Sequence, residues 1–279
     1  LSRTIFDQAS EAVNLDLKKL CLEENDLLDK TEYTQVAMVT ACLAMTRAVE
    51  SMGLHADMTA GLSLGEYCAI AVAGGMCDLD AIRTVRSRGI FMEQAAPEGS
   101  GAMSAVLGMD AAVIEDVLDG REGVSIANYN CPGQIVITGE AAAVAEAGTA
   151  LKEAGARRVL PLKVSGPFHS PMMRPAGEEL AKVFAGVSMN PLKIPYVANI
   201  NAEVITDCGI IEGLLVEQVS GSVRWQQSVE TMIREGVDTF VEIGPGKTLT
   251  GFLRKIDKNV KAYHIGSWEE AVQVCEELK

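Results

Sequence analysis

The segment Gly61-Leu62-Ser63-Leu64-Gly65-Glu66-Tyr67 sets the architecture of this chain, because it joins a short strand predicted over residues 58–62 to an apolar helix predicted over residues 66–73. A serine flanked by glycines at such a junction is typical of a tight turn that exposes the hydroxyl. The Leu64 N–H at the helix start points toward an oxyanion formed on an acyl group. Ser63 is therefore a candidate nucleophile and Leu64 a candidate oxyanion donor, although the same short pattern also occurs in purely structural turns.

The base for such a serine must come from one of only three histidines, at positions 55, 169 and 264. A serine hydroxyl is a weak nucleophile until an adjacent base takes its proton. His55 stands in the approach to the predicted strand, where solvent surrounds it, and His264 lies on a predicted strand near the C-terminus. His169 lies in a loop stiffened by two prolines, and loops at strand ends carry many catalytic bases. We expect His169 to be the general base; the alternative is a loop histidine with a structural hydrogen bond.

No acidic residue is marked by its surroundings as a partner for that histidine. Asp207 and Glu242 are possible orienting groups. A backbone carbonyl could serve instead, since the imidazole needs only a hydrogen-bond acceptor at Nδ1.

Arg88 is a candidate for binding an acidic substrate. It follows the serine turn on a helix predicted over residues 79–94. A guanidinium buried in an apolar pocket binds a carboxylate through two parallel hydrogen bonds. The alternative, which is commoner for a single helical arginine, is a surface ion pair with Glu93 or another acid.

Strands and helices alternate along much of the chain and predict an α/β fold, with a parallel sheet covered by helices on both faces. Residues 101–166 follow a different order, β-α-β-β-α-β, which is the ferredoxin-like pattern. We therefore expect a core made of residues 1–100 and 167–279, and an inserted α+β subdomain made of residues 101–166.

The composition excludes several classes of protein. With 24 Lys and Arg against 38 Asp and Glu, the net charge is −14, which does not suit a binder of nucleic acid or of anionic membranes. No apolar run approaches the roughly 20 residues that cross a bilayer. Seven cysteines, none in a C-x-x-C pair, indicate reduced thiols in the cytoplasm rather than a zinc site or a disulfide framework. The segment Gly244-Pro245-Gly246-Lys247 lacks the spacing of a phosphate loop, and we expect neither a metal nor a cofactor.

Taken together, several segments resemble the malonyl-CoA:acyl carrier protein transacylase family of bacterial fatty acid synthesis. The resemblance includes the serine turn and the loop around His169, and it extends in family order over nearly the whole chain. Its other segments are Arg86-Ser87-Arg88-Gly89 with Phe91-Met92, Gly101-Ala102-Met103, Asn130-Cys131-Pro132-Gly133-Gln134, Val223-Arg224-Trp225 and Glu242-Ile243-Gly244-Pro245-Gly246-Lys247.

The resemblance implies a hydrolase-like α/β core with a ferredoxin-like insert, and a role for each candidate residue. Ser63 would accept the acyl group, His169 would act as its base, and Arg88 would bind the free carboxylate of the malonyl group. Gln218 falls where the family places a residue whose main-chain carbonyl orients the histidine. The implied reaction is ping-pong transfer of malonyl from malonyl-CoA to the phosphopantetheine thiol of acyl carrier protein, in a chain that we expect to be monomeric.

Two departures from the family pattern keep alternatives open. The family often has His before the nucleophile, where this chain has Leu62. The family also begins with a strand and a Gly-Gln-Gly loop that supplies a second oxyanion donor, and we expect both to be missing here. Losing one such donor costs about 10²–10³ in rate. The alternatives are a standalone polyketide-type acyltransferase, a serine thioesterase or hydrolase, and a non-catalytic remnant.

The carrier protein is acidic like this chain, so we expect binding through local basic patches. One candidate set lies on the insert and the other near the C-terminus. The two sets are Arg157, Arg158 and Lys163, and Arg254, Lys255, Lys258 and Lys261.

Overall fold

Two small sheets form the centre of the larger part of the chain in the computed structural model, which describes residues 2–97 and 99–278. In the first sheet, β1 (Thr59–Ala60) pairs in parallel with β6 (Tyr196–Val197), and β6 pairs antiparallel with β7 (Val204–Ile205). In the second, β8 (Thr239–Ile243) and β9 (Lys261–Ile265) are parallel. Helices connect the parallel strands, as such connections require, and the predicted α/β class is confirmed.

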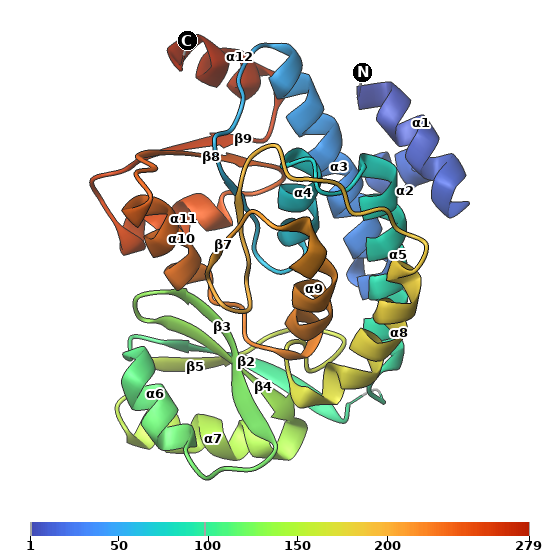
Figure 1. The fold of residues 1–279 in the computed structure, drawn as a ribbon. Coiled ribbons are helices and arrows are strands. Elements are labelled where there is room, and N and C mark those ends of the chain that lie inside the picture. Colours follow the sequence, from blue (N-terminus) through green and yellow to red (C-terminus); the bar gives the residue numbers. More distant parts are fainter. Residues whose placement is uncertain (1, 98, 279) are drawn as a thin grey trace.

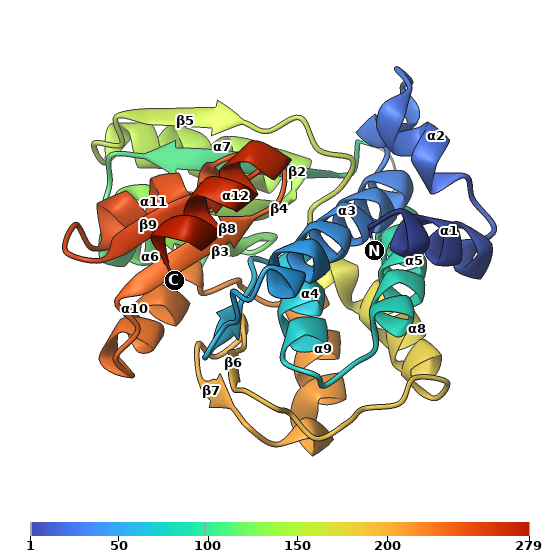
Figure 2. The same ribbon diagram turned by 90° about the horizontal axis from the view of Figure 1, so that it is seen from above.

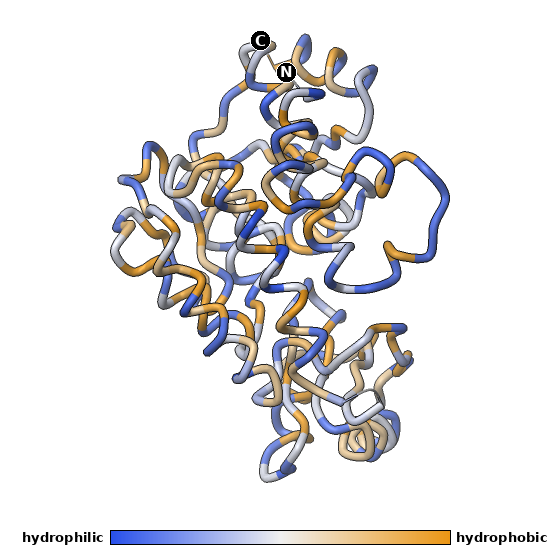
Figure 3. The backbone as a smooth tube through the Cα atoms, turned by 90° about the vertical axis from the view of Figure 1, so that its right-hand side faces the viewer, coloured by the Kyte–Doolittle hydropathy of each residue, from blue (hydrophilic) through white to orange (hydrophobic). Residues whose placement is uncertain are grey.

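Helices surround these sheets, and α3, α4 and α5 lie side by side (Figure 2). Their buried apolar residues, with those of α8 and α9, form the largest core cluster. Hydrophobic and hydrophilic residues alternate along most of the chain (Figure 3), because each element turns one face inward. The helices of this part are α1 (Ser2–Val13), α2 (Leu17–Leu22), α3 (Thr31–Ser51), α4 (Gly65–Val72), α5 (Asp78–Gln94), α8 (Arg174–Phe184), α9 (Ile211–Ser220), α10 (Trp225–Arg234), α11 (Thr248–Ile256) and α12 (Trp268–Glu277), with 3-10 turns at Leu27–Asp29, Pro171–Met173 and Cys208–Ile210.

A four-stranded antiparallel sheet occupies the lower part of Figure 1, with α6 and α7 on its outer face. Its spatial order is β3-β4-β2-β5. Its elements are β2 (Gly101–Leu107), α6 (Ala111–Leu118), β3 (Val124–Cys131), β4 (Gln134–Glu140), α7 (Ala141–Glu153) and β5 (Arg158–Pro161). The elements follow the predicted β-α-β-β-α-β order, and they have a core cluster of their own between the helices and the sheet. The division of the chain into a core and an insert at residues 101–166 stays a prediction.

The last strand of this sheet is shorter than its sequence pattern. It ends at Pro161, although Leu160, Leu162 and Val164 alternate in the manner of a strand that continues to residue 164. All three of these side chains are exposed, so no packed face holds that extension against the sheet. The strand β7 was not predicted, because two residues are too few to show a period. Within the described residues, no helix is both long and apolar enough to cross a membrane.

The strand ends place the candidate residues together. β1 leads directly into the serine turn, the chain leaving β5 leads to His169, and β6 ends two residues before Asn199. α5 and α9 border the same point in space and contribute Arg88 and Gln218.

Candidate active site

The serine turn has the geometry of a strained nucleophile. Ser63 lies between β1 and α4 with φ +49°, in the left-handed region that non-glycine residues rarely adopt. The two flanking glycines are not equivalent. A Cβ on Gly61 would lie 2.0 Å from the carbonyl carbon and oxygen of Gly65, whereas a Cβ on Gly65 would meet nothing within 4 Å. The close approach of the backbone therefore requires a glycine at position 61 only.

The serine hydroxyl and the predicted base are in direct contact. Ser63 Oγ lies 2.7 Å from His169 Nε2, although the two residues are 106 positions apart in the sequence. His169 is buried, and its backbone also lies in the left-handed region, with φ +61°. Its other ring nitrogen, Nδ1, lies 2.8 Å from the main-chain carbonyl oxygen of Gln218.

This pair of contacts fixes the direction of the hydrogen bonds. A carbonyl oxygen only accepts, so Nδ1 of His169 must carry the proton that it donates to Gln218. In the neutral imidazole Nε2 then holds a lone pair and accepts the hydroxyl proton of Ser63. Burial, together with the nearby charge of Arg88, lowers the pKa of His169 to about 4. At neutral pH the imidazole is therefore an unprotonated base beside the hydroxyl.

Arg88 places a buried cation on the other side of the serine. It is 2% exposed, and burial lowers the pKa of its guanidinium. Nη1 donates to Gln35 Oε1 at 2.8 Å, and Nη2 donates to Gln218 Oε1 at 3.1 Å and to Ser63 Oγ at 3.2 Å. The ring of Tyr67 lies 5.6 Å from the guanidinium carbon. Arg88 takes part in no salt bridge among the described residues, and its Nε has no partner among them. The nearby acid is the buried Glu66, whose raised pKa of about 8 keeps its carboxyl largely protonated at neutral pH. A buried cation that meets only neutral groups is suited to an anionic ligand.

A polar network behind the serine was not predicted from the sequence. The side chain of Gln218 donates to the main-chain oxygen of Ser63 at 2.8 Å and to Glu66 Oε2 at 2.7 Å. Glu66 is fully buried, and this burial raises its pKa to about 8. Asn199 contributes two further bonds to the serine turn. Glu66 belonged to the quoted motif without an assigned role, and nothing in the sequence around Gln35 or Asn199 marked either residue.

The Leu64 amide is the free donor at the start of α4. Among the residues that the structure describes, none accepts a hydrogen bond from the Leu64 N–H, whereas the amides of Ser63, Gly65 and Glu66 all have acceptors. The start of a helix also favours negative charge. The role of Leu64 as an oxyanion donor stays a prediction.

The remaining candidates lie apart from the serine. His55 is exposed, and His264 Nε2 donates to the Gly244 carbonyl oxygen, 3.0 Å away. Asp207 accepts from the Gly209 amide. Glu242 accepts from two amides at the start of α11, so a carboxylate already fills the place that a phosphate would take after the glycine turn. Glu93 accepts from the amide of Glu32 rather than from Arg88. The seven cysteines are free, and the described part of the chain holds no cluster suited to a metal ion.

The whole chain is similar to acyltransferases of known sequence and structure. The acyl transferase domain family matches residues 7–274. The malonyl CoA-acyl carrier protein transacylase of Bacillus subtilis is 41% identical over 100% of this chain and 89% of that protein. The enzyme of the same name from Escherichia coli K12 is 43% identical over 90% of this chain and 83% of that protein.

Solved structures agree with the sequence comparisons. The malonyl CoA-acyl carrier protein transacylase of Clostridium perfringens superposes with a TM-score of 0.96 at 39% identity, over 99% of this chain and 89% of that chain. A malonyl-transacylase in complex with a type II polyketide acyl-carrier protein superposes with a TM-score of 0.93 at 37% identity, over 99% and 91%. The similarity therefore covers both the core and the four-stranded sheet.

Proposed function

Because the chain belongs to the acyl transferase family that includes the malonyl CoA-acyl carrier protein transacylases, we propose that it moves a malonyl group from malonyl-CoA to the phosphopantetheine thiol of an acyl carrier protein, for fatty acid elongation. The observation that carries the site assignment is the contact of Ser63 Oγ with both His169 and Arg88, at 2.7 and 3.2 Å. One side of the hydroxyl meets a base and the other a cation. This arrangement combines nucleophile activation with recognition of an acidic acyl group.

The first half of the reaction forms a malonyl-serine ester. His169 Nε2 takes the hydroxyl proton as Ser63 Oγ attacks the thioester carbonyl carbon. The oxygen of the tetrahedral intermediate carries the negative charge, and the Leu64 N–H, which has no acceptor among the described residues, donates to it in this proposal. When the carbon–sulfur bond breaks, the imidazolium of His169 returns its proton to the departing sulfur of coenzyme A.

The second half reverses these steps with a different thiol. The phosphopantetheine thiol gives its proton to His169 Nε2, and its sulfur attacks the ester carbonyl. The carbon–oxygen bond to Ser63 then breaks, and the proton moves from His169 to the serine oxygen. Because the Gln218 carbonyl holds Nδ1 throughout, Nε2 is the nitrogen that moves the proton in both halves.

Arg88 separates this function from the thioesterase alternative. The cation is buried and forms no salt bridge with the described residues, and an enzyme for neutral acyl groups gains nothing from such a group. The free carboxylate of malonate supplies the missing negative charge. The single free carboxylate of the malonyl group thus decides which acyl group reacts.

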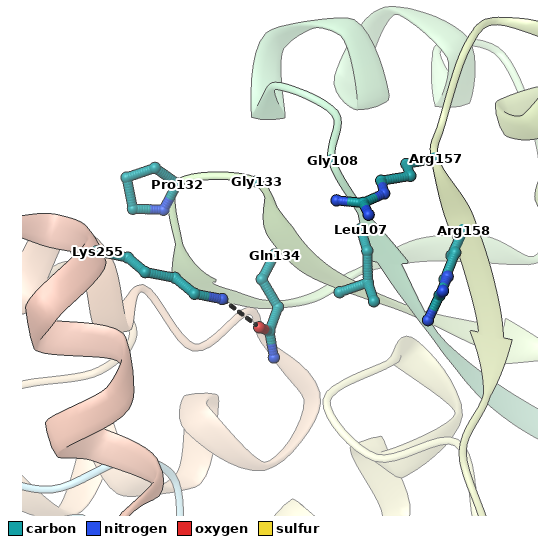
Figure 4. A pocket seen from close by; sticks show the side chains of 8 residues that line it. All are labelled: Leu107, Gly108, Pro132, Gly133, Gln134, Arg157, Arg158 and Lys255. Atoms are coloured by element: carbon teal, nitrogen blue, oxygen red, sulfur yellow. Dashed lines mark hydrogen bonds between the residues drawn. The ribbon is translucent and has the colours of Figure 1, made fainter.

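A basic groove is the proposed docking surface for the carrier protein. Arg157 and Arg158 from the insert lie across a groove of about 400 Å³ from Lys255 on α11, which donates to Gln134 at 3.3 Å (Figure 4). The groove therefore joins members of both predicted basic sets, although the chain as a whole is acidic. Such a local patch attracts an acidic partner and steers its approach. Lys255→Glu should raise KM for the carrier protein and leave Ser63 acylation unchanged. Lys182→Glu, on the exposed surface of α8, is the matched control.

Mass spectrometry of the intact chain tests the catalytic assignment. Mixing with malonyl-CoA should add one malonyl group, Ser63→Ala should remove the addition, and carrier protein should discharge it faster than water does. No adduct on the wild-type chain would reject Ser63 as the acyl acceptor. Discharge to water at the same rate with and without carrier protein would identify a hydrolase instead.

The structural relative in complex with a polyketide carrier favours one second candidate, a polyketide-type acyltransferase. Rates of malonyl transfer to a fatty acid carrier protein and to a polyketide carrier protein, measured side by side, separate the two candidate functions. We further propose a cytoplasmic location, supported by the free cysteines, and a monomeric state, which sedimentation tests.

A further inference from the structure

Asn199 lies where two parallel strands stop pairing through their backbones. The last paired residues of β1 and β6 are Ala60 and Val197, and Asn199 follows two positions later with its side chain fully buried. Beyond this point the serine turn bends away from the chain that follows β6, so main-chain hydrogen bonds no longer join these two segments across the gap between them. The side chain of Asn199 spans it instead.

This side chain holds the turn at two points. Asn199 Oδ1 accepts from the Ser63 N–H at 2.6 Å, and Asn199 Nδ2 donates to the Gly61 carbonyl at 2.8 Å. The two bonds lie on either side of Leu62. They therefore brace the chain at the position where a Cβ on Gly61 would overlap the backbone of Gly65.

Asn199 is itself fixed by its main chain. Its N–H donates to Glu66 Oε2 at 3.3 Å, and its carbonyl accepts from the Arg224 N–H at 2.9 Å. Glu66 lies in the first turn of α4, so Asn199 ties the end of β6 to the turn and to the helix that follows it. Because Oδ1 and Nδ2 bond to different groups of the serine turn, the side chain has one orientation available.

We propose that Asn199 is a positioning residue for acyl transfer, which holds the Ser63 peptide in its left-handed conformation and reserves the next amide, that of Leu64, for the substrate. This inference rests on the proposed role of Ser63 as the nucleophile. A left-handed serine costs free energy that its surroundings must supply. By occupying the Ser63 N–H, Asn199 also decides which amide of the turn stays without a partner.

The test compares Asn199→Ala, Asn199→Asp and the matched control Asn201→Ala in the whole chain. Asn201 is two residues further on, exposed, and its side chain bonds only to Glu203. Two rates are measured for each variant: Ser63 acylation by malonyl-CoA, and Ser63 sulfonylation by phenylmethylsulfonyl fluoride. The second rate reports the reactivity of the serine independently of the natural substrate. KM for malonyl-CoA reports substrate binding, and the midpoint of thermal unfolding reports whether each variant is folded.

We expect Asn199→Ala to lower both rates about 10–100-fold, the size of effect that follows when a reacting group is displaced by about 1 Å, with KM changed less than about threefold. Asn199→Asp keeps the acceptor for the Ser63 N–H and should recover part of the loss. Asn201→Ala should match the wild type. Should the alanine variant not fold, Asn199→Ser, whose hydroxyl is too short to span both contacts, replaces it.

Unchanged rates in a folded Asn199→Ala or Asn199→Ser chain would overturn the proposal. So would a loss that Asn199→Asp does not reduce, or one that a rise in KM accounts for entirely. A wild-type chain that reacts with the sulfonyl fluoride but not with malonyl-CoA would reject the proposed function alone, and the sulfonylation rates would still decide the role of Asn199.

Discussion

Replacing Arg88 by methionine, which has a similar length and no charge, should remove the preference for malonyl over acetyl groups. A guanidinium has five N–H groups, and the bonds to Gln35, Gln218 and Ser63 occupy one on Nη1 and both on Nη2. A carboxylate that binds both terminal nitrogens therefore replaces one of these neutral acceptors on Nη2. A hydrogen bond to a charged group contributes about 1.5–3 kcal/mol, so two such bonds to the malonyl carboxylate contribute about 3–6 kcal/mol. At about 1.4 kcal/mol for each factor of ten, the ratio of kcat/KM for malonyl-CoA to that for acetyl-CoA should fall about 10²–10⁴-fold.

The ratio is the informative quantity, because Arg88 also contacts the nucleophile. Loss of the bond to Ser63 Oγ slows both substrates alike and cancels in the comparison. The assay is a competition between the two thioesters, read by mass spectrometry of the acylated chain. Arg83→Met, on the exposed face of the same helix, is the control. A malonyl preference that survives Arg88→Met within about threefold would refute the assignment.

Three further predictions concern the base, the buried acid and the turn. Acylation of Ser63 should lose half its rate only near pH 4, because burial lowers the pKa of His169 to about 4; a midpoint near the ordinary value of 6.5 in a rapid-quench pH series would contradict this. The free energy of unfolding in urea should fall between pH 4.5 and about 8, because the folded chain keeps the Glu66 proton that the unfolded chain releases. Glu66→Gln should flatten this slope, and an unaltered slope would count against a raised Glu66 pKa. Gly61→Ala should prevent correct folding or abolish acylation, whereas Gly65→Ala should keep near-normal activity. Folded yield and malonylation of Ser63 measure both effects. Equal damage in the two variants would show that the turn is not limited by space at position 61.

The local part of the site could be predicted from the sequence. The glycines around Ser63 indicated a strand-to-helix turn, and such a junction exposes the serine wherever it occurs. His169 followed by elimination, because only three histidines were available and one of them lay in a stiff loop after a strand. The structure places the two in contact. Composition and the short helical pattern around Arg88 gave no means of telling a buried cation from a surface one, and only the resemblance to the family favoured the first.

The residues that support the site could not be predicted in this way. Asn199 and Gln35 act through hydrogen bonds to residues far away in the sequence, and an isolated amide side chain has no periodic or spacing signal. Glu66 was visible within the motif, but its surroundings include Asn199 and Gln218, which reach its carboxyl from distant parts of the chain. Short strands such as β7 could not be predicted from the sequence either, since its two residues form a strand only because β6 lies beside them.

The histidine in this protein is oriented by the main-chain oxygen of Gln218, and this choice has a genetic consequence. A side-chain substitution leaves a peptide carbonyl in place, so scanning mutagenesis cannot delete the third member of the proposed catalytic group. Changes at position 218 would instead report the loss of the amide that joins Arg88, Ser63 and Glu66. Only a change to the backbone itself, or to the path of α9, would expose how much the imidazole depends on that oxygen.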